Sequence, residues 1–219
     1  MRFNIHTLLF LLGMGLPFAL IGQIRPQNHS VLEAGGGINL SYFDIGGGSP
    51  APSFAGSFLF GLGDSWKAGP EVKFHRTRGS DQGTTNESRG YDFKSNIYEL
   101  SARGVYIIRF SQYPYKQWKR SLRPRIFASL GLLQIQPVYN REMAMENDKE
   151  YLPLAFSASG GLGLEYALNN DIGLLLEAGS TLSSSDYLEG YTNDQFSKAR
   201  DMFHSICLKI SYRIPTGWD

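Results

Sequence analysis

The chain has 219 residues, a net charge of +1 at pH 7 and one cysteine, Cys207. The balanced charge, without a basic segment, argues against nucleic acid as a partner, and a single cysteine excludes an internal disulfide. Because 25 residues are glycine, 13 % are aromatic and only 19 % are charged, the composition favours a glycine- and aromatic-rich β-protein of one domain.

The first segment predicts a secretory signal peptide. Arg2 is followed by an uninterrupted apolar run from Leu8 to Ile21, and Gly22 offers a small residue for cleavage. A membrane-spanning helix needs about 20 apolar residues, so this run is too short to be one. We therefore assign residues 1–22 to a signal peptide; a short membrane anchor is the alternative.

Eight segments follow in which apolar residues alternate with small, polar or charged ones. A period of two places alternate side chains on opposite faces of a β-strand. In the fourth segment, for example, Tyr98 and Leu100 alternate with Glu99 and Ser101. Helical spacing is not seen in windows of similar length. We predict an all-β protein with strands at residues 31–43, 53–62, 65–77, 96–110, 122–134, 154–167, 171–183 and 202–214.

The connections between these strands alternate in length. The links after the second and sixth strands are tight, whereas those after the third, fifth and seventh are long and polar. Outer-membrane barrels have short periplasmic turns and long external loops. The pattern predicts an eight-stranded antiparallel up-and-down transmembrane β-barrel in the cell outer membrane, with both termini in the periplasm. Its parts are a short periplasmic leader (23–30), the barrel (31–214) and a periplasmic tail (215–219).

The apolar face must be covered by lipid or by a protein core. A soluble lipocalin-like barrel is the alternative, because alternation alone does not say which face points outward. The signal peptide, the unequal loops and the aromatic residues near strand ends favour lipid, since aromatic girdles mark the membrane interfaces of such barrels. These aromatic residues are Tyr42, Trp66, Phe110, Tyr166 and Tyr212. Outer-membrane lipid is therefore the first predicted partner.

The opposite face then forms a polar lumen. The interior of an eight-stranded barrel is just wide enough to be filled by side chains. A pore is therefore a weak alternative function for this protein. Opposed charges inside it can pair and hydrogen-bond. We expect Glu99 to pair with Arg123 or Arg125. Arg103 is expected to pair with Glu71. The predicted lumen network comprises Glu33, Glu71, Glu99, Arg103, Arg123, Arg125, Glu165, Glu177, Lys209 and Arg213.

Glycine-rich stretches at 35–37 and 160–163 resemble phosphate-binding loops only superficially. Neither opens a predicted helix, which the phosphate-binding motif requires. Glycine within a strand permits strong curvature and close approach of a neighbouring backbone. We expect these glycines to shape a narrow barrel.

Three segments carry a resemblance to a known family. They are "YELS" (98–101), "RPRIFASLG" (123–131) and "SDYL" (185–188). Over residues 31–214 the chain resembles the family of small outer-membrane barrels of the Bacteroidota that includes PorG of the type IX secretion system. The resemblance implies an eight-stranded, non-enzymatic barrel that anchors a secretion or periplasmic assembly to the outer membrane. It also implies the periplasmic ring proteins of that system as partners.

The link between the fourth and fifth strands is a candidate partner contact. By parity it is periplasmic, yet it is longer than a usual turn. It carries Tyr113, Tyr115, Trp118, Lys119 and Arg120, and aromatic and arginine side chains are enriched at binding hot spots. The alternative is an interfacial girdle in which the basic residues meet lipid phosphates.

Enzymatic activity is the competing hypothesis. A lipid-modifying barrel could acylate or deacylate lipid A with a histidine near its outer rim, and His204 has that position with Asp201 close by. Ser205 is adjacent to His204 on the strand, so the two side chains point to opposite faces and cannot form a nucleophile–base pair. The acidic link at 142–150 reads as a solvated loop rather than a calcium site. We expect no catalytic residue, cofactor or metal.

Overall fold

The computed structural model describes residues 29–42, 47–63, 65–80, 82–83, 92–108, 122–139, 154–185, 188 and 201–215. The predicted signal peptide, the candidate partner segment at 111–121 and the acidic link at 142–150 lie outside these ranges. Within them, no helix is long and apolar enough to cross a membrane.

The described chain consists of antiparallel strands. They are β1 (His29–Tyr42), β2 (Gly47–Gly48), β3 (Ala51–Gly61), β4 (Trp66–Ser80), β5 (Asp92–Ile107), β6 (Leu122–Tyr139), β7 (Leu154–Ala167), β8 (Ile172–Ser183) and β9 (Met202–Pro215). The bounds of β7 agree with the predicted strand. The other strands differ at one or both ends, most of all β5, which begins at Asp92, and β6, which continues to Tyr139. His29, Ser30 and Pro215 also belong to strands, so the barrel extends past both ends of the predicted range 31–214.

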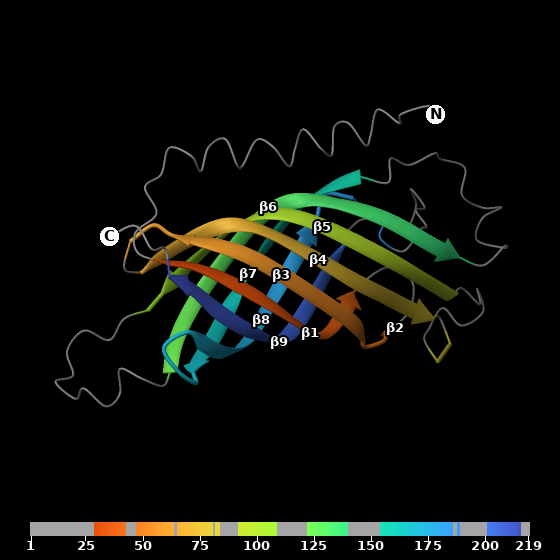
Figure 1. The fold of residues 1–219 in the computed structure, drawn as a ribbon. Coiled ribbons are helices and arrows are strands. Elements are labelled where there is room, and N and C mark those ends of the chain that lie inside the picture. Colours follow the sequence, from red (N-terminus) through yellow and green to blue (C-terminus); the bar gives the residue numbers. More distant parts are fainter. Residues whose placement is uncertain are drawn as a thin grey trace, which may run out of the picture.

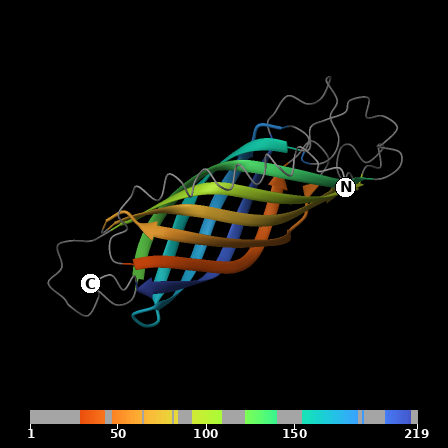
Figure 2. The ribbon, with the colours of Figure 1, turned by 45° about the horizontal axis from the view of Figure 1, so that its top comes forward.

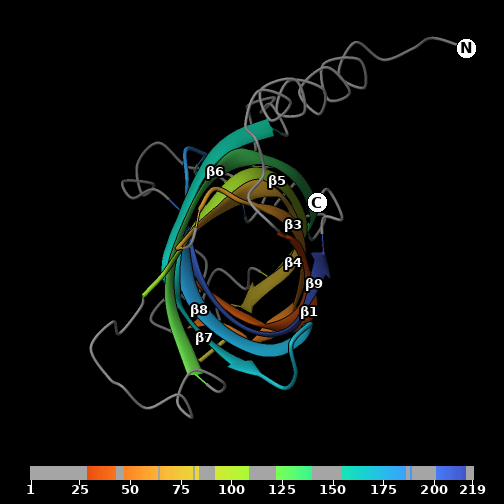
Figure 3. The ribbon, with the colours of Figure 1, turned by 60° about the vertical axis from the view of Figure 1, so that its left-hand side comes forward.

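The strands form one closed barrel (Figures 1 and 3). Their order is β4-β3-β1-β9-β8-β7-β6-β5, and β4 pairs with β5 to complete the ring, while the short β2 pairs with the end of β4. Apart from the short β2, each strand pairs with its neighbours in sequence, and β1 pairs with β9. The predicted eight-stranded antiparallel up-and-down architecture is confirmed.

The barrel has two distinct ends. The first, here called the termini end, holds the start of β1 and the end of β9, where His29 pairs with Pro215. The tight links from β3 to β4 and from β7 to β8 lie at this end. The other, here called the loop end, holds the start of β9 and the end of β8, where Met202 pairs with Leu182.

Alternation sorts the side chains into an inner and an outer set. In β8, Gly173, Leu175 and Glu177 are buried while Leu174 and Leu176 are exposed, and the other strands repeat the pattern. Large apolar side chains are exposed on every long strand, including Leu130 at 70 % and Phe156 at 71 %. An apolar surface this extensive is incompatible with water, so the outer face requires lipid or another apolar cover.

Aromatic pairs mark the outer face at two heights. Trp66 and Tyr106 lie near the termini end with ring centroids 4.8 Å apart. Phe74 and Tyr98 lie nearer the loop end, with centroids 5.2 Å apart. On β4, Trp66 and Phe74 are eight positions apart, which is about 26 Å along the strand. With a strand tilt of about 40° this is about 20 Å along the barrel axis, comparable to the ~25 Å apolar band of outer-membrane barrels.

Two glycines permit close packing of β1 against β9. A Cβ atom on Gly35 would lie 2.1 Å from the backbone oxygen of Leu208, and one on Gly37 would lie 1.9 Å from that of Ile206. Both positions share the parity of the inward-facing Glu33, so they point into the barrel. The strand β1 is strongly bent along its length (Figure 2). Only glycine leaves room for the backbone of β9 at these points, in agreement with the role expected for this glycine-rich stretch.

Candidate functional site

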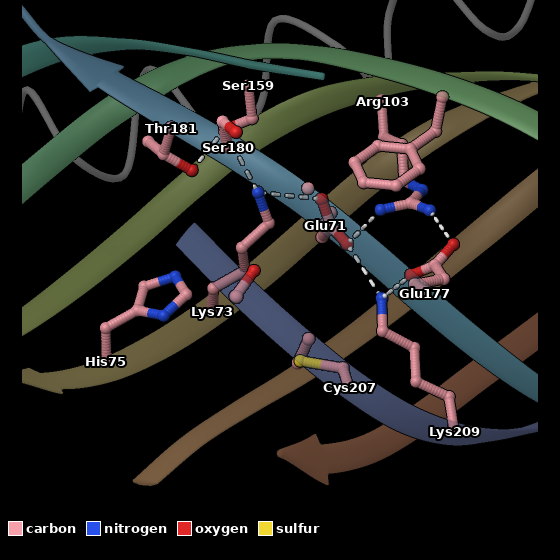
Figure 4. Close-up of a pocket in the computed structure, with 14 residues that line it drawn as sticks. Glu71, Lys73, His75, Arg103, Ser159, Glu177, Ser180, Thr181, Cys207 and Lys209 are labelled. Atoms are coloured by element: carbon pink, nitrogen blue, oxygen red, sulfur yellow. Dashed lines mark hydrogen bonds and ion pairs between the residues drawn. The ribbon is translucent and has the colours of Figure 1, made fainter. Parts of the chain in front are cut away.

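A network of buried charges fills the middle of the barrel (Figure 4). Arg103 on β5 donates from Nη1 to Glu71 Oε1 at 2.7 Å and from Nη2 to Glu177. Lys209 on β9 contacts the same two glutamates, at 3.2 Å to Glu71 Oε1 and 2.6 Å to Glu177 Oε2. Strands on opposite sides of the barrel are therefore joined through charge-assisted hydrogen bonds, which are stronger than hydrogen bonds between neutral groups.

Arg125 extends this network toward β1. Its Nη1 donates to Glu33 Oε1 at 2.7 Å and its Nη2 donates to Glu177 Oε1 at 2.9 Å. Ser57 donates to the other oxygen of Glu33 at 3.0 Å. Glu177 thus receives Arg103, Arg125 and Lys209. Glu71 likewise contacts three cations, namely Lys73, Arg103 and Lys209.

Glu99 lies toward the loop end of the network. Lys73 donates to its Oε1 at 3.1 Å and Ser157 donates to it at 3.2 Å, while His75 Nε2 lies 3.8 Å from Oε2. The predicted pairing of Glu99 with Arg123 or Arg125 is wrong. Glu99 is opposite Leu133 on β6, eight positions from Arg125 and about 26 Å away along the strand. On β4 it is directly opposite Lys73.

The central network, defined as Glu33, Glu71, Glu99, Glu177, Lys73, Arg103, Arg125 and Lys209, contains as many cations as carboxylates. All of these residues except Lys73 are at most 4 % exposed. A buried charge without a partner of opposite sign costs several kcal/mol of stability. Equal numbers of carboxylates and cations therefore allow the central network to be buried. Phe127 adds an aromatic face, with the guanidinium carbon of Arg103 4.1 Å from the ring centroid.

An apolar layer closes the lumen on the loop side of this network. We call it the apolar plug; it comprises Ile97, Leu133, Ile135, Ala155, Leu188 and Phe203, each at most 4 % exposed. This layer was not predicted from the sequence, because the inner face was expected to be polar throughout. The alternation along β6 nevertheless predicts it in part, because Leu133 and Ile135 lie an even number of positions from the inward-facing Arg125 and so share its face.

Little free volume remains between plug and network. A cavity of about 20 Å³ lies beside Lys73, His75 and Cys207. That is space for about one water molecule. The described lumen is therefore filled by side chains rather than arranged as a channel.

The termini end of the lumen has a different character. Glu165 accepts a hydrogen bond from Ser211 at 3.2 Å, and its oxygens lie 3.8 Å from Arg123 Nη1 and 3.9 Å from Arg125 Nη1. Lys67 and Arg213 also face inward here. We call Lys67, Arg123, Arg213 and Glu165 the basic mouth. All ten residues of the predicted lumen network thus lie on the inner face, divided between the centre and this mouth.

The outer face near the loop end carries one polar pair. Ser180 on β8 and His204 on β9 are opposite each other, with Ser180 Oγ 2.6 Å from His204 Nδ1. Asp201, which the sequence placed beside His204, is instead 3 % exposed on the inner side, where it accepts a hydrogen bond from the backbone N–H of Leu188. Ser180 was missed because its pairing depends on strand register.

The described ranges bring together no group of three His, Cys, Asp or Glu side chains that could hold a metal ion. Residues Tyr113, Tyr115, Trp118, Lys119 and Arg120, the candidate partner contact, lie outside those ranges.

Comparison with known proteins identifies the fold. Neither protein-family models nor curated proteins match the chain. Among solved structures, Neisserial surface protein A matches with a TM-score of 0.53 and 10 % identity, over 84 % of this chain and 96 % of that one. OprG from Pseudomonas aeruginosa matches with a TM-score of 0.45 and 10 % identity, over 89 % and 100 %. Ail of Yersinia pestis matches with a TM-score of 0.43 and 14 % identity, over 85 % and 99 %.

At 10 % identity, the match to Neisserial surface protein A bears on the fold alone. Together with the closed ring and the apolar exterior, it defines the chain as an eight-stranded β-barrel of the outer-membrane type.

Proposed function

We propose that the protein is a non-enzymatic barrel that anchors a periplasmic assembly to the outer membrane, as a PorG-like component of a type IX secretion system. The filled lumen is the observation that carries this proposal. Because the buried side chains of the central network and the apolar plug cross the described lumen, and the cavity beside them has room for about one water molecule, transport through the barrel is disfavoured. The two ends of the barrel are then the regions where the protein would bind its partners.

The links between strands support the proposed orientation. The tight turns and the start and end of the barrel lie at the termini end, which in outer-membrane barrels faces the periplasm. The link between β5 and β6 also begins and ends there, since Ile107 and Leu122 both lie at the termini end. Its aromatic and basic residues would thus face periplasmic partners, in line with the resemblance to the PorG-containing family.

The direct test is a pull-down of the tagged full-length protein from detergent extract, with partners identified by mass spectrometry. We expect periplasmic ring proteins of a secretion system to be recovered. A variant with Tyr115, Trp118 and Arg120 replaced by alanine should assemble as a barrel and lose those partners. If the variant recovers the same partners as wild type, the link between β5 and β6 is an interfacial girdle and not a partner contact. If wild type recovers no secretion protein, the anchoring function is refuted.

The second candidate function is a lipid-modifying enzyme, favoured by the hydrogen bond between Ser180 and His204 on the outer face. A serine hydroxyl bonded to an imidazole is the core of a nucleophile–base pair. Mass spectrometry of lipid A from cells expressing wild type, Ser180→Ala or no protein tests it. Our primary proposal predicts three identical lipid A profiles. A change that depends on the Ser180 hydroxyl would establish the enzyme instead.

A further inference from the structure

The charges of the lumen are balanced at its centre and unbalanced at its termini end. In the basic mouth, Lys67, Arg123 and Arg213 face inward, and among the described residues Glu165 is the one buried carboxylate near them. Arg125, which also approaches Glu165, already has Glu33 and Glu177 as closer partners. The mouth therefore holds more cations than its own carboxylate can neutralise.

The existing contacts inside the mouth are loose. Arg123 Nη1 lies 3.8 Å from Glu165 Oε1, which is an ion pair beyond hydrogen-bond length. Arg213 lies within electrostatic range of both Arg123 and Glu165, and Asp171 on the exposed β7–β8 turn is the other carboxylate near it. Arg123 and Arg213 thus retain unused capacity for an additional anion.

Among the described residues, the mouth opens at the termini end. The side chain of Arg123 is 28 % exposed, and Arg213 is half-buried beside a small recess that Glu165, Ser211 and Asn169 also line. On the other side the central network and the apolar plug close the lumen. A ligand must therefore enter along the barrel axis, and because these side chains face inward, headgroups of lipids packed on the outer wall are poorly placed to reach them.

We propose that the basic mouth binds an acidic peptide segment of a periplasmic protein, with carboxylates held by Arg123 and Arg213. The planar guanidinium group presents paired donors that match a carboxylate, and Arg is preferred over Lys for such bidentate contacts. An excess of like charge at a low-dielectric opening also steers an oppositely charged segment toward it. This inference rests on the proposed function, for which it names the chemistry of the partner, and on the periplasmic orientation of the termini end.

Binding can be measured without knowing the partner. Fluorescein-labelled hexaglutamate is titrated with the purified full-length barrel in a nonionic detergent, and fluorescence anisotropy is followed. We expect salt-sensitive binding that weakens about tenfold in the double variant Arg123→Gln/Arg213→Gln, because charge-assisted contacts are lost whose strength salt partly screens. Arg76→Gln is the matched control, since Arg76 is exposed on β4 toward the loop end. It should bind within twofold of wild type.

Three results would overturn the inference. They are no binding of hexaglutamate by wild type, equal weakening by Arg76→Gln, and displacement of the peptide by inorganic phosphate at constant ionic strength, which would indicate a phosphate site. Heat-modifiable migration on gels confirms that each variant is folded. The pull-down is independent of this assay: recovery of secretion proteins with failed peptide binding would refute the basic mouth alone.

Discussion

Arg125 on β6 and Glu177 on β8 form a hydrogen bond of 2.9 Å over the intervening strand β7, because the residue between them has no side chain. That residue is Gly163, which is in register with Arg125 on one side and with Glu177 on the other. A Cβ atom there would lie 2.9 Å from Arg125 Cγ and 3.2 Å from Glu177 Cγ. The glycine is thus a structural part of the central network.

Gly163→Ala should therefore destabilise the barrel by about 1–3 kcal/mol, the usual cost of overpacking a filled interior. Urea unfolding in detergent, followed by tryptophan fluorescence, measures this. Gly160→Ala on the same strand is the control, since its Cβ would meet only Phe127 O at 3.7 Å. Equal stability of the two variants would show that the hydrogen bond between Arg125 and Glu177 does not depend on the absence of a side chain at Gly163.

Glu177→Gln should be more costly, because it leaves Arg103, Arg125 and Lys209 without their shared carboxylate. We expect a loss on the order of 3–5 kcal/mol. Adding Lys209→Gln restores the charge balance, so the double variant should be more stable than Glu177→Gln alone. Asp171→Asn, at an exposed turn, should change stability by less than about 0.5 kcal/mol. A Glu177→Gln barrel as stable as Asp171→Asn would contradict the network.

The sequence predicted the strands and faces but not which residues meet. Alternation placed Glu99, Arg103 and Lys209 inside because a strand has only two faces. Partners depend on register, and nothing in a single strand states which residue of the next strand is opposite. Arg103 was correctly matched to Glu71, whereas Glu99 was assigned to β6 although Lys73 faces it on β4. The same limitation concealed the Ser180–His204 pair.

The filled lumen predicts the behaviour of the protein in planar lipid bilayers. Arg103 lies between Glu71 and Glu177, and the apolar plug lies beyond them, so side chains obstruct the passage of ions along the described lumen. Purified protein should produce no steady conductance above that of detergent alone. A 16-stranded porin in the same bilayers is the positive control. Reproducible unitary conductance from the purified barrel would show that the interior opens.

Orientation in the outer membrane is the claim on which the functional proposals depend, and thiol labelling in intact cells tests it most directly. Cysteine is introduced at Gln82, exposed at the loop end, or at Asn170, exposed in a turn at the termini end, in a Cys207→Ser background. A membrane-impermeant maleimide too large for porins should label Gln82→Cys in intact cells. It should label Asn170→Cys only after the outer membrane is permeabilised. Labelling of Asn170→Cys in intact cells, or recovery of the protein as a soluble periplasmic species, would contradict the account.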